Sequence, residues 1–145
     1  MQNDFFEKIS DKMNLTAEEI NQLSPLVLAY IGDSVYEVLV RTYMVSENGQ
    51  LSVNKLHRNS IGFVKAHAQS ETVHRLMDLL NEDELNIVRR GRNSKSGTVP
   101  KNADLTEYKY ATGFEALIGY LYLKKDFNRL TEVFFRAVDV SKNKD

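Results

Sequence analysis

The sequence contains no cysteine, so it can form neither disulfide bonds nor thiolate metal ligands, and any metal would have to bind to oxygen or imidazole. It contains no apolar run near the roughly 18 residues that span a bilayer, and its N-terminus lacks the basic and apolar regions of a secretory signal. We therefore expect a cytoplasmic protein that makes no contact with a membrane.

Proline and glycine are also scarce, with two and seven copies in 145 residues, while apolar residues recur at three-to-four spacing through the longer segments. That period is the helical one, and the chain has the length of one domain. We therefore expect an all-α fold in which residues 1–145 form a single domain. The 42% hydrophobic and 27% charged fractions argue against disorder.

Capping and breaking residues divide this pattern into helices. Thr16 should open a short helix, and Pro25 should begin a long one that runs to the mid-40s before Gly49. Asn81 should cap a helix that ends near residue 91. Asp104 is interpreted as a helix cap rather than a catalytic acid. The other expected segments are one bent helix or two over 53–80, a loop over 92–102, and helices over 105–123 and 127–140.

Two acidic residues interrupt apolar helical stretches. Asp33 directly follows Gly32, and Glu115 lies two residues after Gly113. A buried carboxylate costs several kcal/mol unless it is paired, hydrogen-bonded or bound to a cation. Because glycine allows close approach, we expect the two helices to cross with both carboxylates at the crossing, where they could share one Mg²⁺ ion.

A plainer interpretation stays open for each acid. Asp33, Glu37 and Arg41 follow at four-residue spacing on one helix face, where a surface ion pair between Glu37 and Arg41 would be ordinary. Glu115 could instead be a structural carboxylate paired to Lys109 or Arg41.

Positive charge is concentrated locally, although the formal net charge is only −1. Residues 87–103 contain no acid, and serine and threonine hydroxyls that could join the bases in contacting phosphates lie between them. A solvated charge run is the default interpretation of such a block, and contact with an anionic partner is the functional alternative. His57 and His67 do not have the spacing that metal-binding histidines usually have. The expected phosphate-contacting residues are Arg89, Arg90, Arg92, Lys95 and Lys101 in this basic block, and His57, Arg58 and Lys65 in a second cluster.

Three segments, in this order along the chain, resemble one enzyme family. Ribonuclease III endonuclease domains have a signature that resembles LAYIGDSVYE at residues 28–37, and a second acidic motif that resembles ATGFEALIG at residues 111–119. The subgroup called Mini-ribonuclease III resembles the chain at RGRN, residues 90–93, and at KSGTVPKN, residues 95–102. The resemblance extends from residue 24 to residue 136.

The resemblance implies an all-helical homodimer that hydrolyses double-stranded RNA with Mg²⁺ and trims the ends of precursor 23S ribosomal RNA. It makes Asp33 and Glu115 both catalytic residues and metal ligands, and it makes the basic residues the RNA contacts, because no separate double-stranded-RNA-binding domain is expected. A ribosomal protein is a candidate partner. Where larger ribonuclease III enzymes carry two further acids, this chain has Ala29 and Thr112, which leaves fewer carboxylates for a two-metal arrangement.

Two other interpretations compete with this one. A non-catalytic RNA-binding module for ribosome assembly would need the basic loop but neither acid, and a helical interaction protein would need neither RNA nor metal. A dimer would also need apolar side chains beyond those that the core consumes. Tyr30, Tyr36 and Phe114 are the expected sources, with completion of the monomer core as the alternative for each.

Overall fold

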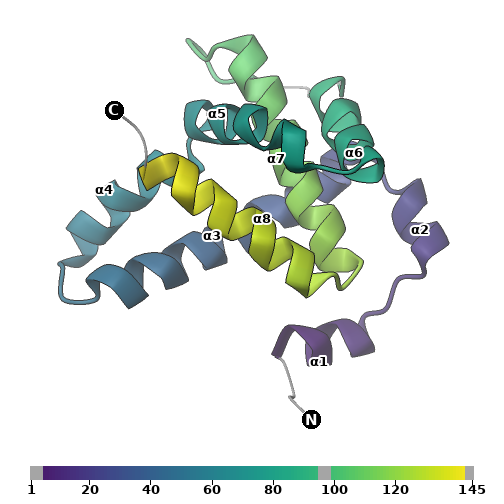
Figure 1. The fold of residues 1–145 in the computed structure, drawn as a ribbon, viewed down its shortest axis with the longest axis horizontal. Helices are drawn as coiled ribbons and strands as arrows, with labels where there is room; N and C mark the ends of the chain where they lie inside the picture. The colour runs from purple at the N-terminus through teal and green to yellow at the C-terminus, as the bar shows by residue number, and fades with distance from the viewer. Residues whose placement is uncertain (1–4, 95–98, 143–145) are drawn as a thin grey trace.

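The computed structural model describes residues 5–94 and 99–142, and every regular element within these ranges is a helix (Figure 1). The prediction of an all-α fold is therefore confirmed. The helices are α1 (Phe5–Lys12), α2 (Ala17–Gln22), α3 (Pro25–Asn48), α4 (Val53–Val64), α5 (Ala66–Leu76), α6 (Glu82–Arg92), α7 (Leu105–Leu123) and α8 (Phe127–Lys142), with a 3₁₀ turn η1 (Met77–Leu79) between α5 and α6.

Side-chain caps set the helix starts that the sequence predicts. Thr16 and Glu19 form a reciprocal capping box at the start of α2, with both nitrogen–oxygen distances at 3.1 Å. Asn81 takes part in a second capping box at the start of α6. Asp104 accepts a hydrogen bond from the backbone nitrogen of Glu107 at 3.1 Å and is therefore the cap of α7, as expected.

The segment 53–80, which was expected to form one bent helix or two, forms the two helices α4 and α5 followed by the 3₁₀ turn. The break lies at Lys65, whose extended backbone (φ −69°, ψ 154°) ends α4 and begins α5. Neither proline nor glycine marks that break in the sequence. The short helix α1 was not predicted, and α8 continues to Lys142. Residues 95–98 of the predicted loop lie outside the described part of the chain.

The central helix is α7, which packs against α3, α5 and α6 and also contacts α8 (Figure 1). Most of its residues from 111 to 121 are buried, on all sides of the helix. A helix that is apolar around its whole circumference belongs inside a protein core. In the part of the chain that the structure describes, we find no helix of the length and apolarity that a membrane crossing requires.

The helices α3 and α7 cross in direct backbone contact. A Cβ atom on Gly32 would overlap the carbonyl oxygen of Glu115, and a Cβ atom on Gly119 would overlap the carbonyl oxygen of Leu28. Each helix therefore needs glycine at the crossing, because any larger residue would push the two backbones apart.

Gly113 does not belong to this crossing, so that part of the sequence prediction is wrong. It packs against α6, where an added Cβ would lie 2.6 Å from the carbonyl oxygen of Val88. A Cβ on Gly91 would in turn lie 2.7 Å from the Cα of Gly113. Gly113, two residues before Glu115, thus allows the basic C-terminal end of α6 to pack closely against α7.

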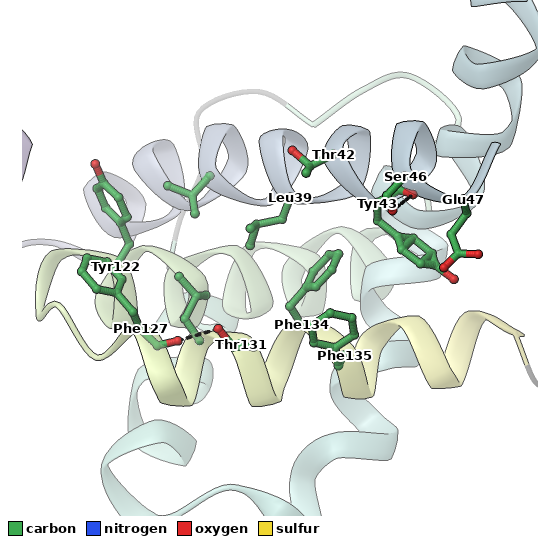
Figure 2. A pocket seen from close by; sticks show the side chains of 12 residues that line it. Leu39, Thr42, Tyr43, Ser46, Glu47, Tyr122, Phe127, Thr131, Phe134 and Phe135 are labelled. Atoms are coloured by element: carbon green, nitrogen blue, oxygen red, sulfur yellow. Dashed lines mark hydrogen bonds between the residues drawn. The ribbon is translucent and has the colours of Figure 1, made fainter. Parts of the chain in front are cut away.

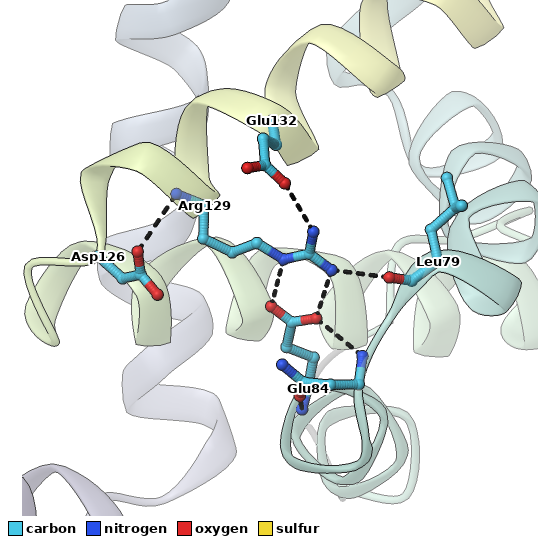
Figure 3. A network of polar contacts seen from close by, with 6 residues as sticks. Leu79, Glu84, Asp126, Arg129 and Glu132 are labelled. Atoms are coloured by element: carbon cyan, nitrogen blue, oxygen red, sulfur yellow. Dashed lines mark hydrogen bonds and ion pairs between the residues drawn. The ribbon is translucent and has the colours of Figure 1, made fainter.

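Arg129 of α8 fastens the last helix to the start of α6 (Figure 3). Its guanidinium donates to both carboxylate oxygens of Glu84, at 2.7 and 2.8 Å, to the carbonyl oxygen of Leu79 at 2.7 Å and to Glu132 at 2.9 Å. Burial alone would raise the pKa of Glu84. The hydrogen bonds from Arg129 and from the backbone of Asn81 outweigh burial and hold that pKa below its usual value.

Candidate functional site

Asp33 and Glu115 meet where α3 crosses α7. Gly32 lets the two backbones touch at Glu115 itself, so Asp33, the next residue along α3, is brought to the same place. Asp33 is near enough to Glu115 to raise the pKa of the Glu115 carboxyl group. The crossing therefore joins two acids that lie far apart in the sequence.

The surroundings of Glu115 favour its protonated form. Burial is the largest influence, and the hydrogen bond and negative charge of Asp33 add to it, so that the pKa of Glu115 is raised to about 9. The expectation that both acids are buried is wrong for Asp33, which is exposed, while Glu115 is partly buried. Asp33 escapes burial because it lies at the rim of the crossing, one residue beyond the glycine that makes the contact. At neutral pH the pair therefore keeps a proton on Glu115.

Gln69 is a third polar side chain at this site, and the sequence prediction did not include it. It lies on α5 and is only 2% exposed. Its amide is close enough to lower the pKa of Glu115, yet its Nε2 atom makes no hydrogen bond to any described residue. A buried amide without a partner costs roughly 1–3 kcal/mol. The signal in the sequence was its i, i+4, i+7 spacing with the buried Val73 and Leu76, which places a polar residue on an apolar helix face.

Asp33 and Glu115 can hold a hard divalent cation. Mg²⁺ is usually held by one or two carboxylates, with water and phosphate as its other ligands. Within residues 5–94 and 99–142, no group of three or more histidine or acidic side chains converges on one point. Ala29 is buried, and the Thr112 hydroxyl donates to the carbonyl oxygen of Tyr108 at 3.0 Å, so neither adds a ligand.

Glu37 and Arg41 form a surface ion pair, as the plainer interpretation expects. The Arg41 Nη2 lies 2.9 Å from the Glu37 Oε1, and both residues sit one or two turns beyond Asp33 on α3. Lys109 is exposed, and the groups that shift the pKa of Glu115 are Asp33 and Gln69. Within the described part of the chain, neither Lys109 nor Arg41 therefore pairs with Glu115.

The basic block at 87–103 is divided between the surface and the interior. Arg89 and Lys101 are exposed. Arg90 is partly buried and donates to the carbonyl oxygen of Leu23, at the end of α2, over 3.4 Å. The prediction for Lys95 falls on a residue outside the described ranges.

Arg92 is held in place by α7. Its guanidinium carbon lies 5.5 Å from the centre of the Tyr110 ring, and its Nη1 donates to the Tyr110 hydroxyl at 3.2 Å. The ring of His74, from α5, packs against the same tyrosine at 4.1 Å between centroids. Tyr110 belongs to the helix that carries Glu115, so the position of Arg92 is tied to that of the acid pair.

The second predicted cluster lies around α4. His57, Arg58 and Lys65 are all exposed, which leaves them available to a large anionic ligand. His57 and Arg41 also line a hollow of about 180 Å³ between α3 and α4.

An apolar hollow of about 420 Å³ lies between α3 and α8 (Figure 2). Leu39 and Tyr43 of α3 and Phe134 and Phe135 of α8 contribute to its lining. Among the described residues, neither the acid pair nor a predicted phosphate contact lines it. It is therefore separate from the candidate site.

Known proteins resemble the chain in both sequence and fold. Residues 26–126 match the ribonuclease III domain. The chain is 53% identical over 126 residues to the Mini-ribonuclease 3 of Thermoanaerobacter sp., covering 87% of this chain and 88% of that protein. It is 52% identical over 125 residues to the Mini-ribonuclease 3 of Clostridium tetani, covering 86% and 83%. A crystal structure of a Fusobacterium nucleatum protein has a similar fold, with a TM-score of 0.74 and 29% identity over 83% of this chain and 95% of that one.

Proposed function

The chain belongs to the ribonuclease III family, within its Mini-ribonuclease III group, and from this premise we propose that it is an endoribonuclease that cleaves double-stranded RNA with the help of Mg²⁺. The observation that carries the proposal is the proximity of Asp33 and Glu115 at the α3–α7 crossing. Burial and the nearby charge of Asp33 disfavour the ionisation of Glu115. A module that only bound RNA would gain nothing from this pair of acids.

Asp33 and Glu115 are the residues that we propose hold the metal ion. When bound, the ion would polarise the scissile phosphate and lower the pKa of a water molecule, which supplies hydroxide near neutral pH. Glu115 would release its proton so that both carboxylates are ionised. Because Asp33 is exposed and Glu115 is partly buried, a phosphate of a large substrate can reach the pair from the side of Asp33.

The exposed bases of the domain itself would hold the RNA. A-form RNA hides its base edges in a narrow major groove, so the contacts should be to phosphates and 2′-hydroxyls. Arg89 and Arg92 lie on α6 and Lys101 lies before the start of α7, whereas His57 and Arg58 lie on α4 and Lys65 at its end. Arg90 should contribute less, because its guanidinium already has a backbone partner.

A homodimer is the working unit that we propose. Of the three aromatic residues expected at its interface, Tyr30 is 80% exposed, whereas Tyr36 and Phe114 are fully buried with their rings 5.0 Å apart. Tyr36 and Phe114 therefore belong to the core of the monomer, as the alternative interpretation expected. Tyr30 shares one face of α3 with the exposed Val27 and Val38. An exposed apolar face of this kind favours contact with a second copy of the chain.

The position of this face suits a two-stranded substrate. Asp33 lies next to it on α3, so a two-fold axis through the face would bring two acid pairs to neighbouring places. Two sites related by a dyad match the antiparallel strands of an RNA duplex.

The resemblance to Mini-ribonuclease III also supports the finer parts of the proposal. As the finer part of the proposal, we propose the ends of precursor 23S ribosomal RNA as the substrate and a ribosomal protein as a partner. The lack of cysteine accords with action in the cytoplasm.

The test compares cleavage of double-stranded RNA by the purified protein with Mg²⁺ and with EDTA. We expect cleavage only with Mg²⁺. Asp33→Asn keeps the shape of the side chain but removes its charge, so cleavage should fall by orders of magnitude while RNA affinity and helix content persist. Asp104→Asn is the matched control and should cut normally, because asparagine also caps helices well. RNA that is bound but never cut would favour the ribosome-assembly module instead.

A further inference from the structure

We propose that Tyr110 is a positioning residue for RNA binding, which holds the guanidinium of Arg92 where its unused donors can reach a phosphate of an RNA duplex. The proposal rests on the RNA-binding role proposed above for the bases of this domain. It gives a task to an aromatic side chain on α7 that the sequence prediction did not include.

Arg92 is fixed through two of its donors. Its Nε donates to the Oδ1 of Asn93 at 3.1 Å, and its Nη1 donates to the hydroxyl of Tyr110 at 3.2 Å. The guanidinium carbon also lies 5.5 Å from the centre of the Tyr110 ring, which is within the range of a cation–π contact. Further N–H donors remain on the terminal nitrogens of Arg92, where phosphate oxygens are usually bound.

The partners of Arg92 leave its positive charge in place. Asn93 and Tyr110 are both uncharged, whereas Arg41 and Arg129 lie 2.9 and 2.7 Å from glutamate oxygens and are neutralised within the protein. A guanidinium binds phosphate best when its plane is oriented so that two parallel donors meet two oxygens. An arginine that its neighbours orient without neutralising it is therefore suited to a phosphate contact.

Tyr110 is itself held from the side of α5. The ring of His74 packs against it with the two centroids 4.1 Å apart. The Nδ1 of His74 lies 2.7 Å from the carbonyl oxygen of Ser70 and donates to it, because a carbonyl oxygen can only accept. Side chains of α5, α6 and α7 thus form one stack that ends at Arg92. Because the stack orders Arg92 before RNA arrives, binding avoids the entropic cost of ordering this long side chain.

The experiment measures the affinity of the full chain for a short double-stranded RNA in EDTA, by fluorescence anisotropy. Tyr110→Phe keeps the ring against His74 but removes the hydroxyl that accepts from Arg92, so the fold should persist while Arg92 gains freedom. Ordering one long side chain on binding corresponds to a loss of affinity of roughly 2–10-fold. We expect Tyr110→Phe to lose affinity within this range. Unchanged affinity would overturn the proposal.

Arg92→Ala shows whether Tyr110 acts through Arg92. In a chain that already carries Arg92→Ala, the further change Tyr110→Phe should cause no additional loss, because nothing remains to be positioned. A loss of the same size in both backgrounds would overturn the proposal, since Tyr110 would then act on the RNA directly or through the fold. If Arg92→Ala binds RNA as tightly as the parent, Arg92 makes no RNA contact and the proposal falls.

Tyr120→Phe is the matched control. Tyr120 lies on the same helix, and its ring centre is 5.2 Å from the Nζ of Lys124, which is not among the proposed RNA contacts. This variant should bind RNA like the parent. Cleavage with Mg²⁺, measured in parallel, separates the proposal from the proposed function. A chain that binds RNA without cutting it would refute the endoribonuclease, while the affinities in EDTA would still decide the role of Tyr110.

Discussion

Replacement of Gly32 by alanine should separate α3 from α7 and so disrupt both the fold and the acid pair. The new methyl group would lie 2.7 Å from the backbone nitrogen of Gly119, and nearer still to the carbonyl oxygen of Glu115, whereas ordinary contact begins at 3.4 Å. Both atoms belong to the backbone of the central helix. No side chain can therefore rotate out of the way, and α3 itself has to move.

The expected loss of stability follows from this geometry. Overpacking of a core costs about 1–3 kcal/mol, and sometimes more. Because the obstacle here is backbone on both sides, we expect a loss at the upper end, about 3 kcal/mol. For a domain of this size that corresponds to a fall in the unfolding midpoint of roughly 6–12 °C. A displacement of the order of 1 Å between Asp33 and Glu115 should also reduce RNA cleavage by about 100-fold.

Gly62→Ala is the matched control for this prediction. Gly62 lies inside α4, and a Cβ there would meet nothing within 4 Å, so alanine should stabilise the helix by roughly 0.5–1 kcal/mol. Thermal unfolding followed by far-ultraviolet circular dichroism compares the two variants. Equal stability of Gly32→Ala and Gly62→Ala would refute the backbone contact at the crossing, and full cleavage activity in Gly32→Ala would refute its role in placing the acids.

Three further predictions concern stability, RNA binding and assembly. Glu84→Gln should be about 3 kcal/mol less stable at neutral pH, because it breaks the buried pair with Arg129. Folding lowers the pKa of Glu84, so the extra stability of the parent is complete above the unfolded pKa of about 4.3 and is lost as the pH falls through the lower folded pKa. The urea midpoints of the two proteins should therefore converge in acid. A constant gap between the midpoints would contradict this. Arg89→Ala and Arg92→Ala should each reduce the slope of log affinity against log salt concentration by slightly less than about one unit, without a change in kcat at saturating RNA. A loss confined to kcat would instead place these bases in the chemical step. Tyr30→Arg should convert the dimer to a monomer in light scattering, and a dimer that survives this change would move the interface elsewhere.

Local sequence was a reliable guide to the helix starts. Thr16, Asn81 and Asp104 each cap a helix through a backbone nitrogen three residues away, so the interaction is contained within one short segment. The bend at Lys65 was not predictable in this way, because its extended backbone has no proline or glycine to mark it.

The sequence predicted some residues of the candidate site and missed others. Asp33 and Glu115 were identified because a charged residue inside an apolar helical stretch is visible in the sequence, and because both stretches resemble known motifs. Gln69 is uncharged and belongs to no such motif, so its burial and its influence on the pKa of Glu115 become visible only in the folded protein. The inward turn of Arg90 toward the end of α2 depends on a similar long-range contact.

The sequence by itself determined the all-helical class, most helix boundaries, the two acids and the family to which the chain belongs. Only the tertiary structure decided that Gly32 meets α7 while Gly113 meets α6, and that Tyr30 faces outward while Tyr36 and Phe114 are buried. The physical reason is that helical periodicity fixes which residues share a face, since that depends on the geometry of one helix. Which neighbour covers each face depends on how all the helices pack together, and no single segment of the sequence carries that information.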